Sequence, residues 1–184
     1  MADFAVLMEN EGKVHVVEVK NESVKHKGIG VCNLHEILHN VNIGEEVLIG
    51  QKYFTKMPPN LPELVSGMAR RAQTISAKDA GFLISKLGIG VGSTVLEAGL
   101  GSGGLSLHLA KVLGESGHLV TVEPRSEHAE IGLENLHRAK LCFQEFPTHT
   151  HFEGLAEEVD LQFSFDAIIF DMPNHSPAIE KCSS

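Results

Sequence analysis

The chain has 184 residues, of which 42% are hydrophobic and 21% are charged, and its formal net charge at pH 7 is -9. These values are typical of a globular protein, exclude long disordered tracts and disfavour a generally basic nucleic-acid-binding protein. No apolar run approaches the ~18 residues of a membrane span, and no signal peptide is expected at the N-terminus. Three scattered cysteines, Cys32, Cys142 and Cys182, fit a reducing cytoplasm.

The first sixty residues have the pattern of a small β-domain. The valine-rich segment Val14–Lys20 alternates in part between apolar and polar residues, and shorter segments of the same kind follow, separated by glycines. Three prolines between residues 58 and 62 then interrupt the pattern, because proline cannot continue a ladder of strands. We therefore predict a β-domain over residues 1–60 and a second domain over residues 61–184.

From Lys78 onward, strand patterns alternate with helical ones. The expected strands are 94–97, 119–122, 149–152 and 167–170. Such alternation predicts a parallel sheet with right-handed crossovers, that is, a Rossmann-like α/β domain. The last expected strand is a continuous apolar run, as in strands that are buried on both faces, and few residues follow it. We therefore expect the sheet to be incomplete at the C-terminus.

The stretch Glu97–Ser106, EAGLGSGGLS, is the most specific motif of the chain. It fits the G-x-G-x-x-G loop of dinucleotide-binding domains and also the looser acidic-x-G-x-G-x-G loop that holds S-adenosylmethionine. In both loops, glycines let the backbone approach the ligand, and the following helix begins with free N–H groups. The glycines concerned here are Gly99, Gly101, Gly103 and Gly104.

Acidic residues at three strand ends favour S-adenosylmethionine over a dinucleotide. Glu97 lies two residues before Gly99, where a carboxylate would repel a pyrophosphate and attract a cationic amino group. Glu123 ends the next strand, where it can accept hydrogen bonds from ribose hydroxyls of either cofactor. Asp171 follows the strand at 167–170 and faces the same crevice, since parallel strands present their carboxyl ends together. We predict a methyltransferase rather than a dehydrogenase.

Together these motifs resemble the tRNA (adenine-58-N1)-methyltransferase family, in its archaeal and bacterial single-subunit form. The resemblance runs from about Gly28 to Pro173 and is carried by R-x-x-Q-x-x-x-x-K-D from Arg70 to Asp79, by the glycine loop and by FDMP at 170–173. It implies an S-adenosylmethionine-dependent enzyme that methylates N1 of an adenine in the T-loop of tRNA. It also implies a cytoplasmic homotetramer, although this chain is C-terminally short.

The resemblance assigns roles to individual residues around the cofactor. It places Gln73 beside the cofactor, with Glu123 and His128 at the ribose. Leu155 and Glu157 would lie in the segment that flanks the adenine ring. The residues that would line the methionine end are Ser102, Gly103, Gly104 and Leu105.

The implied chemistry is an in-line displacement at a sulfonium by the lone pair of adenine N1, so no strong base has to remove a proton first. The enzyme mainly has to align the reacting atoms. Positive charge then moves to the adenine ring, and a carboxylate that accepts a hydrogen bond from the exocyclic amine would stabilise it. The resemblance places Asp171 at this junction, as the catalytic residue. A paired adenine would have to be flipped or unstacked to reach it.

Two alternatives stay open. The sequence QTIS, from Gln73 to Ser76, is also similar to a stretch of the protein-L-isoaspartate O-methyltransferases, so a methyltransferase that acts on protein carboxylates or a small molecule is the first alternative. A truncated homologue that binds the cofactor or a partner subunit without catalysis is the second.

Histidine-rich segments predict no further chemistry. Cys32-x2-His35-x3-His39 has part of the spacing of a metal site, but a fourth ligand is not evident, so we expect no metal. His149 and His151 alternate along an expected strand and share one face, where we expect solvated side chains.

Overall fold

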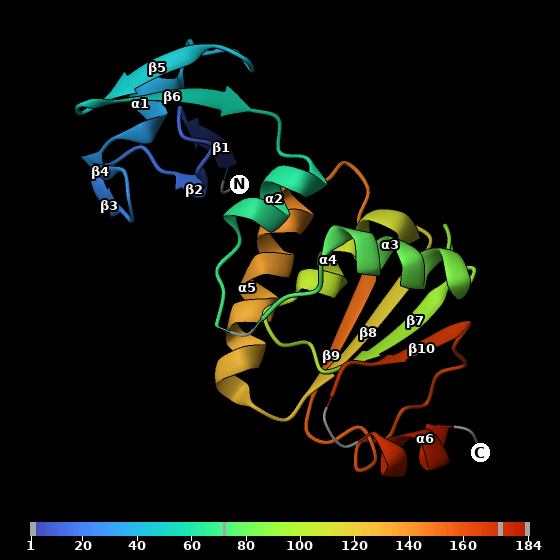
Figure 1. Cartoon of the computed structure of the whole chain (residues 1–184). Coiled ribbons are helices and arrows are strands. Elements are labelled where there is room, and N and C mark those ends of the chain that lie inside the picture. The colour runs from blue at the N-terminus through green and yellow to red at the C-terminus, as the bar shows by residue number, and fades with distance from the viewer. Residues whose placement is uncertain (1–2, 72, 173–174, 183–184) are drawn as a thin grey trace. The chain divides into compact units, whose positions relative to one another are not determined.

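A computed structural model describes residues 3–71, 73–172 and 175–182 of the chain (Figure 1). The structure divides into two compact units. The first consists of the chain up to Met68 together with Leu141–Phe143, and the second consists of Ala69–Lys140 and the chain from Gln144 onward. No helix among the described residues is long and apolar enough to cross a membrane.

The first unit is built on an antiparallel sheet of four strands in the order β2-β1-β6-β5, with a separate two-stranded sheet, β3-β4. Its elements are β1 (Asp3–Glu9), β2 (Val14–Val19), β3 (Val24–His26), β4 (Gly30–Cys32), α1 (Leu34–Leu38), β5 (Glu46–Ile49), β6 (Lys52–Met57) and α2 (Leu61–Gly67). Helix α2 begins within the proline-rich segment and packs against β1 and β2, so the first unit extends beyond the prolines to Met68.

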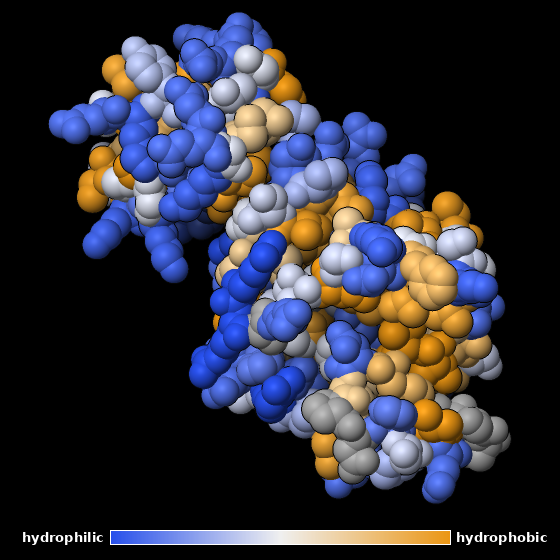
Figure 2. All heavy atoms as spheres, in the orientation of Figure 1, coloured by the Kyte–Doolittle hydropathy of each residue, from blue (hydrophilic) through white to orange (hydrophobic). Residues whose placement is uncertain are grey.

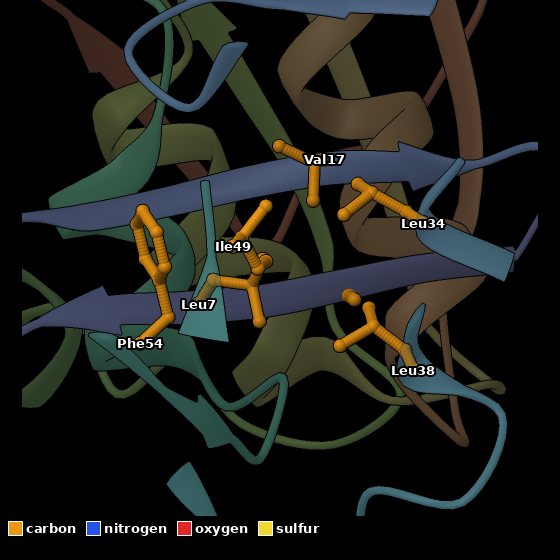
Figure 3. Packing of buried hydrophobic residues seen from close by; sticks show 7 residues of the cluster. Leu7, Val17, Leu34, Leu38, Ile49 and Phe54 are labelled. Atoms are coloured by element: carbon orange, nitrogen blue, oxygen red, sulfur yellow. The ribbon is translucent and has the colours of Figure 1, made fainter. Parts of the chain in front are cut away.

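The core of the first unit lies between its four-stranded sheet and α1. Leu7 of β1, Phe54 of β6 and Leu34 of α1 are fully buried there, and Figure 3 shows Val17 and Ile49 in the same cluster. Alternation along the strands produces this core, because every second side chain of a strand points to the same face. Each fully buried Leu or Phe contributes about 1.5–3 kcal/mol.

The second unit contains the parallel sheet that the sequence predicts, with strand order β10-β7-β8-β9. The strands are β7 (Thr94–Ala98), β8 (His118–Glu123), β9 (Thr148–Glu153) and β10 (Ala167–Phe170). The helices are α3 (Ala77–Lys86), α4 (Gly104–Leu113), α5 (Ser126–Cys142) and α6 (Ser176–Cys182). Because all four strands run in the same direction, their carboxyl ends, and the loops that follow them, meet at one edge of the sheet.

One face of this sheet packs its apolar residues into a second core. Leu96 and Ala98 of β7 and Val120 of β8 are buried together with Ala178 of α6. The alternate residues of the same strands, such as Glu97 and Thr121, point to the opposite face. The carboxyl of Glu97 bonds to α4, which lies on that face.

The two histidines of β9, His149 and His151, are not solvated as predicted. His149 Nε2 and His151 Nδ1 each lie 2.9 Å from the hydroxyl oxygen of Thr121, which is fully buried on β8. The expectation that these histidines are solvated is therefore wrong, because β9 turns them toward the neighbouring strand. Burial, together with the smaller effect of the nearby His151, lowers the pKa of His149 to about 4. Both rings are consequently held neutral at pH 7.

Candidate functional site

A cavity of about 360 Å³ opens where the strands of the parallel sheet end. Residues at the end of each strand or just after it line the cavity: Ala98 and Gly99 at the end of β7, Val122–Arg125 at the end of β8, Gly154–Glu157 after β9, and Asp171 and Met172 after β10. Five of the residues singled out in the sequence line this one cavity: Gly99, Glu123, Leu155, Glu157 and Asp171. Open parallel sheets bind their ligands at this edge.

Gly99 brings the ends of β7 and β10 into contact. Its φ is +100°, and a Cβ atom added to it would lie 2.2 Å from the backbone oxygen of Asp171. The amide of Asp171 in turn donates a hydrogen bond to the Ala98 oxygen at 2.8 Å. Only glycine permits this approach. The backbone of Asp171 is thus fixed at the rim of the cavity, while its side chain is exposed.

Glu123 carries a fully buried carboxylate between the glycine loop and the start of α5. The Gly101 amide donates to its Oε2 at 2.9 Å, and Arg125 donates to its Oε1 from Nε at 2.8 Å and from the backbone amide at 3.2 Å. Burial by itself raises the pKa of Glu123, but the hydrogen bonds from Arg125 and Gly101 outweigh burial and hold the pKa below its ordinary value. The carboxylate is therefore ionised at neutral pH.

Beyond Gly99, the glycine loop is not among the residues that line the cavity. Gly103 is the N-cap of α4 in the left-handed conformation, with φ +76°, and no side chain caps the helix there. The first-turn amides of α4 are therefore uncapped by any side chain. The four residues that the sequence assigned to the methionine end are buried around this turn and are not among the lining residues: Ser102, Gly103, Gly104 and Leu105.

Glu97 differs from the ionised carboxylate that the sequence argument requires. Its side chain is 1% exposed, does not line the cavity, and accepts a hydrogen bond from Ser106 Oγ of α4 at 2.5 Å. Burial raises the pKa of Glu97 to about 8, and the hydrogen bond from Ser106 opposes this rise only in part. At pH 7 the carboxyl of this chain is mostly protonated, so repulsion of a pyrophosphate by Glu97 no longer supports the choice of cofactor.

Two buried polar atoms of residues that the sequence assigned to the cofactor site have no hydrogen-bond partner among the described residues. They are Glu157 Oε2, on a residue of the lining, and His128 Nδ1, in the first turn of α5. A buried polar atom without a partner is uncommon and indicates that a ligand or water completes the site. Gln73 is exposed and lies outside the lining, in the segment that leads into α3. Pro173, the last residue of the FDMP sequence, lies outside the described residues.

Two residues of this region were missed in the sequence. Arg125, two residues after Glu123, holds the Glu123 carboxylate. Asn135 is buried on α5 and bonds to the glycine loop. The burial of Asn135 could have been predicted from the sequence, because this residue lies on the buried side of α5 with the apolar Leu136 and Ala139. No pattern in the sequence pointed to the role of Arg125.

No group of three or more His, Cys, Asp or Glu side chains in the described ranges is placed to hold a metal ion.

The parallel sheet and its glycine loop define a Rossmann-like fold of the S-adenosylmethionine-dependent methyltransferase class. The structure is similar to that of an S-adenosylmethionine-dependent O-methyltransferase from Thermotoga maritima, with a TM-score of 0.76 and 25% identity over 98% of this chain and 66% of the other. It has the same fold as the tRNA (m1A58) methyltransferase TrmI of Aquifex aeolicus, with a TM-score of 0.70 and 23% identity over 98% of this chain and 69% of the other.

Sequence comparison gives the family. A family model described as the tRNA methyltransferase complex GCD14 subunit matches residues 51–184, and the chain belongs to this family. It is 30% identical to the tRNA (adenine(57)-N(1)/adenine(58)-N(1))-methyltransferase TrmI of Methanocaldococcus jannaschii, over 75% of this chain and 48% of that relative. It is 28% identical to the tRNA (adenine(58)-N(1))-methyltransferase TrmI of Thermus thermophilus, over 97% of this chain and 69% of that relative. The chain thus spans about half of the archaeal relative. The predicted fold and family are confirmed.

Proposed function

We propose that the second unit binds S-adenosylmethionine in the cavity at the carboxyl ends of its strands. Two features of the cavity and one of the adjoining glycine loop fit this cofactor. The ionised carboxylate of Glu123 is an acceptor for ribose hydroxyls. Glu157 Oε2, which lacks a partner in the described part of the chain, is an acceptor for the amine of the adenine ring. The uncapped first turn of α4 suits the carboxylate of the methionine end.

When bound, S-adenosylmethionine supplies an electrophilic methyl group on a sulfonium. The chain has to hold the acceptor in line with that group, and orientation of this kind contributes about 7–11 kcal/mol in the best cases. Asp171 is our proposed catalytic residue, because it is exposed at the rim and its backbone is fixed to β7. Its carboxylate can accept a hydrogen bond from an exocyclic amine as positive charge develops on the acceptor ring.

The acceptor is, in this proposal, N1 of adenine 58 in the T-loop of tRNA. Membership of the tRNA methyltransferase family and the similarity to the adenine-N1 methyltransferases of Methanocaldococcus jannaschii and Thermus thermophilus support this substrate. An adenine inside a stack cannot reach the rim of the cavity, so the nucleotide has to be flipped or unstacked. Transfer to a protein carboxylate or a small molecule, and cofactor binding without transfer, are the outcomes that would speak against this acceptor.

We also propose that the first unit, predicted from the sequence as residues 1–60, is a domain of its own, and that the chain assembles into a cytoplasmic homotetramer. The second unit exposes large apolar side chains, among them Phe82 of α3, Leu87 and Val91, the last at 77%. Figure 2 shows hydrophobic surface gathered on this unit. Apolar surface of this kind often marks a contact with another protein. Sedimentation equilibrium of the chain would measure its oligomeric state.

Calorimetric titration with S-adenosylhomocysteine tests the cofactor. We expect the unaltered chain to bind it and Glu123→Gln to bind it much more weakly, since an amide is a poorer acceptor than an ionised carboxylate. Glu134→Gln is the matched control, because Glu134 lies on the exposed side of α5 and pairs only locally with Arg138. Equal binding by all three proteins would contradict the role of Glu123.

Mass spectrometry of nucleosides from treated tRNA tests the acceptor, with N1-methyladenosine as the expected product.

A further inference from the structure

The segment between α2 and α3 is tied to the glycine loop at several points. This segment, here called the strap, comprises Ala69–Arg71 with Gln73 and Thr74. The Arg71 amide donates to Ser102 Oγ at 3.1 Å. Further along the strap, Thr74 lies so close to Gly104 that a Cβ atom on Gly104 would come within 2.9 Å of Thr74 Cβ. The strap therefore crosses the start of α4, directly against the turn that the glycines form.

Asn135 of α5 makes the central connection between the strap and the loop. Its Oδ1 accepts a hydrogen bond from the Ala69 amide at 3.1 Å, and its Nδ2 donates to the Ala69 oxygen at 2.8 Å. The same Nδ2 donates to the Ser102 oxygen at 2.9 Å. The side chain is 3% exposed, so these bonds form away from water. The side chain thus uses both donors and its acceptor, which is the full capacity of an Asn amide apart from one lone pair.

No other side chain reproduces this arrangement. Leucine has nearly the same shape but would leave the Ala69 amide and two carbonyl oxygens without the partners they have now. Aspartate keeps an acceptor for the Ala69 amide but loses both donors and sets a carboxylate against two carbonyl oxygens. Glutamine is one methylene longer in a buried position. A buried polar side chain that is fully bonded to three backbone groups fixes their relative position.

We propose that Asn135 is a positioning residue that holds the strap on the glycine loop and thereby places Gln73 for the cofactor. The second half of this inference rests on the proposed function and on the expectation, implied by the family resemblance, that Gln73 lies beside the cofactor. Gln73 follows Arg71 by two residues and precedes Thr74, so the bonds to Ser102 and the contact with Gly104 flank it on both sides. Release of Asn135 frees the strap at Ala69, and the strap, with Gln73 in it, then loses one of its ties to the glycine loop.

Limited trypsin digestion of the full chain tests the first half of the inference without any cofactor. Arg70 and Arg71 lie within the strap, and trypsin needs the backbone to leave its hydrogen bonds before it can cut. In Asn135→Leu we expect cleavage after these two residues to rise about tenfold, because the locally open state becomes more populated. Asn135→Asp should give a smaller rise. Glu134→Gln, next to Asn135 on the exposed face, should leave the pattern unchanged.

The pattern of cleavage separates positioning from a general loss of structure. A rise confined to Arg70 and Arg71, with Lys111 and Arg138 still protected, supports the inference. Unchanged cleavage in the strap, or an equal rise at all four residues, would overturn it. If Asn135→Leu does not fold, the milder Asn135→Asp decides on the same criteria.

Binding of S-adenosylhomocysteine tests the second half. We expect Asn135→Asp to raise the Kd about tenfold and Gln73→Ala to raise it no further in the Asn135→Asp background, because both act through one contact. Additive effects of the two substitutions would overturn the link to Gln73. If the strap is released as expected but the unaltered chain does not bind S-adenosylhomocysteine, the proposed function is contradicted. The inference that Asn135 holds the strap on the glycine loop would still stand.

Discussion

Among the described glycines, Gly99 has the closest neighbour to an added side chain. A side chain there meets both a backbone conformation that L-residues rarely adopt and the Asp171 oxygen at 2.2 Å. We expect Gly99→Ala to lower the free energy of unfolding by roughly 1–3 kcal/mol through overpacking and strain, and to weaken binding of S-adenosylhomocysteine. Urea unfolding and calorimetry measure the two effects. Gly90→Ala is the matched control, because a Cβ there meets nothing within 4 Å. Equal behaviour of the two variants would show that the close approach of β7 and β10 is unimportant.

Arg125 keeps Glu123 ionised in a buried place. Without Arg125, burial remains as the strongest influence on the carboxyl, so its pKa should rise. Cofactor binding that depends on the ionised form is lost as pH falls through this pKa. We therefore expect the midpoint of pH-dependent binding of S-adenosylhomocysteine to move to higher pH in Arg125→Ala. Arg138→Ala, which removes an exposed helical ion pair, serves as control. A midpoint that stays in place would contradict the role of Arg125.

At the scale of elements, periodicity predicted the strands of the second unit well. The expected strand at 167–170 coincides with β10, and the expected strand at 119–122 is β8 without its terminal residues. Buried parallel strands are continuous apolar runs, which the sequence displays directly. Strands β1 and β6 of the first unit were not expected, because their apolar residues alternate poorly. Pairing with neighbouring strands fixes them, since β1 lies between β2 and β6, and β6 lies between β1 and β5. The tie through Asn135 joins three separate segments and could not be predicted from local pattern.

The buried histidine contact between β8 and β9 makes the free energy of unfolding depend on pH. His149 has a pKa of about 4 in the folded chain and an ordinary value near 6.5 when unfolded. The unfolded chain therefore binds more protons between these values, and stability falls as pH drops from about 6.5 to about 4. We expect His149→Gln to flatten this part of the curve of unfolding free energy against pH. His35→Gln, at an exposed position on α1, should leave the curve as it is. A curve that keeps its slope in His149→Gln would exclude the buried ring as its cause.

At the scale of the whole molecule, the family and the fold could be predicted from the sequence, because the motifs of the sequence lie at the ends of the four parallel strands. Gly99, Glu123 and Asp171 are far apart in the chain, yet the parallel topology brings them to one cavity. Glu97 does not carry the charge that its place at a strand end predicts, because it is buried against α4 and its pKa is raised. Because the net charge is -9, binding of tRNA would have to depend on local basic surfaces and not on an overall electrostatic attraction.

Transfer of a labelled methyl group to tRNA is the most direct measurement of the proposed function. The full chain would be incubated with S-adenosylmethionine carrying a heavy methyl group and with two transcripts of one tRNA, which differ only in adenine or guanine at position 58. We expect labelled N1-methyladenosine in the first transcript alone, and at least about 100-fold less of it with Asp171→Ala, as for the loss of one charge-stabilising group. Label at N1 in both transcripts, or unchanged transfer by Asp171→Ala, would contradict the assignment of the acceptor or of the catalytic residue. A chain that binds S-adenosylhomocysteine and labels neither transcript would contradict the proposed activity.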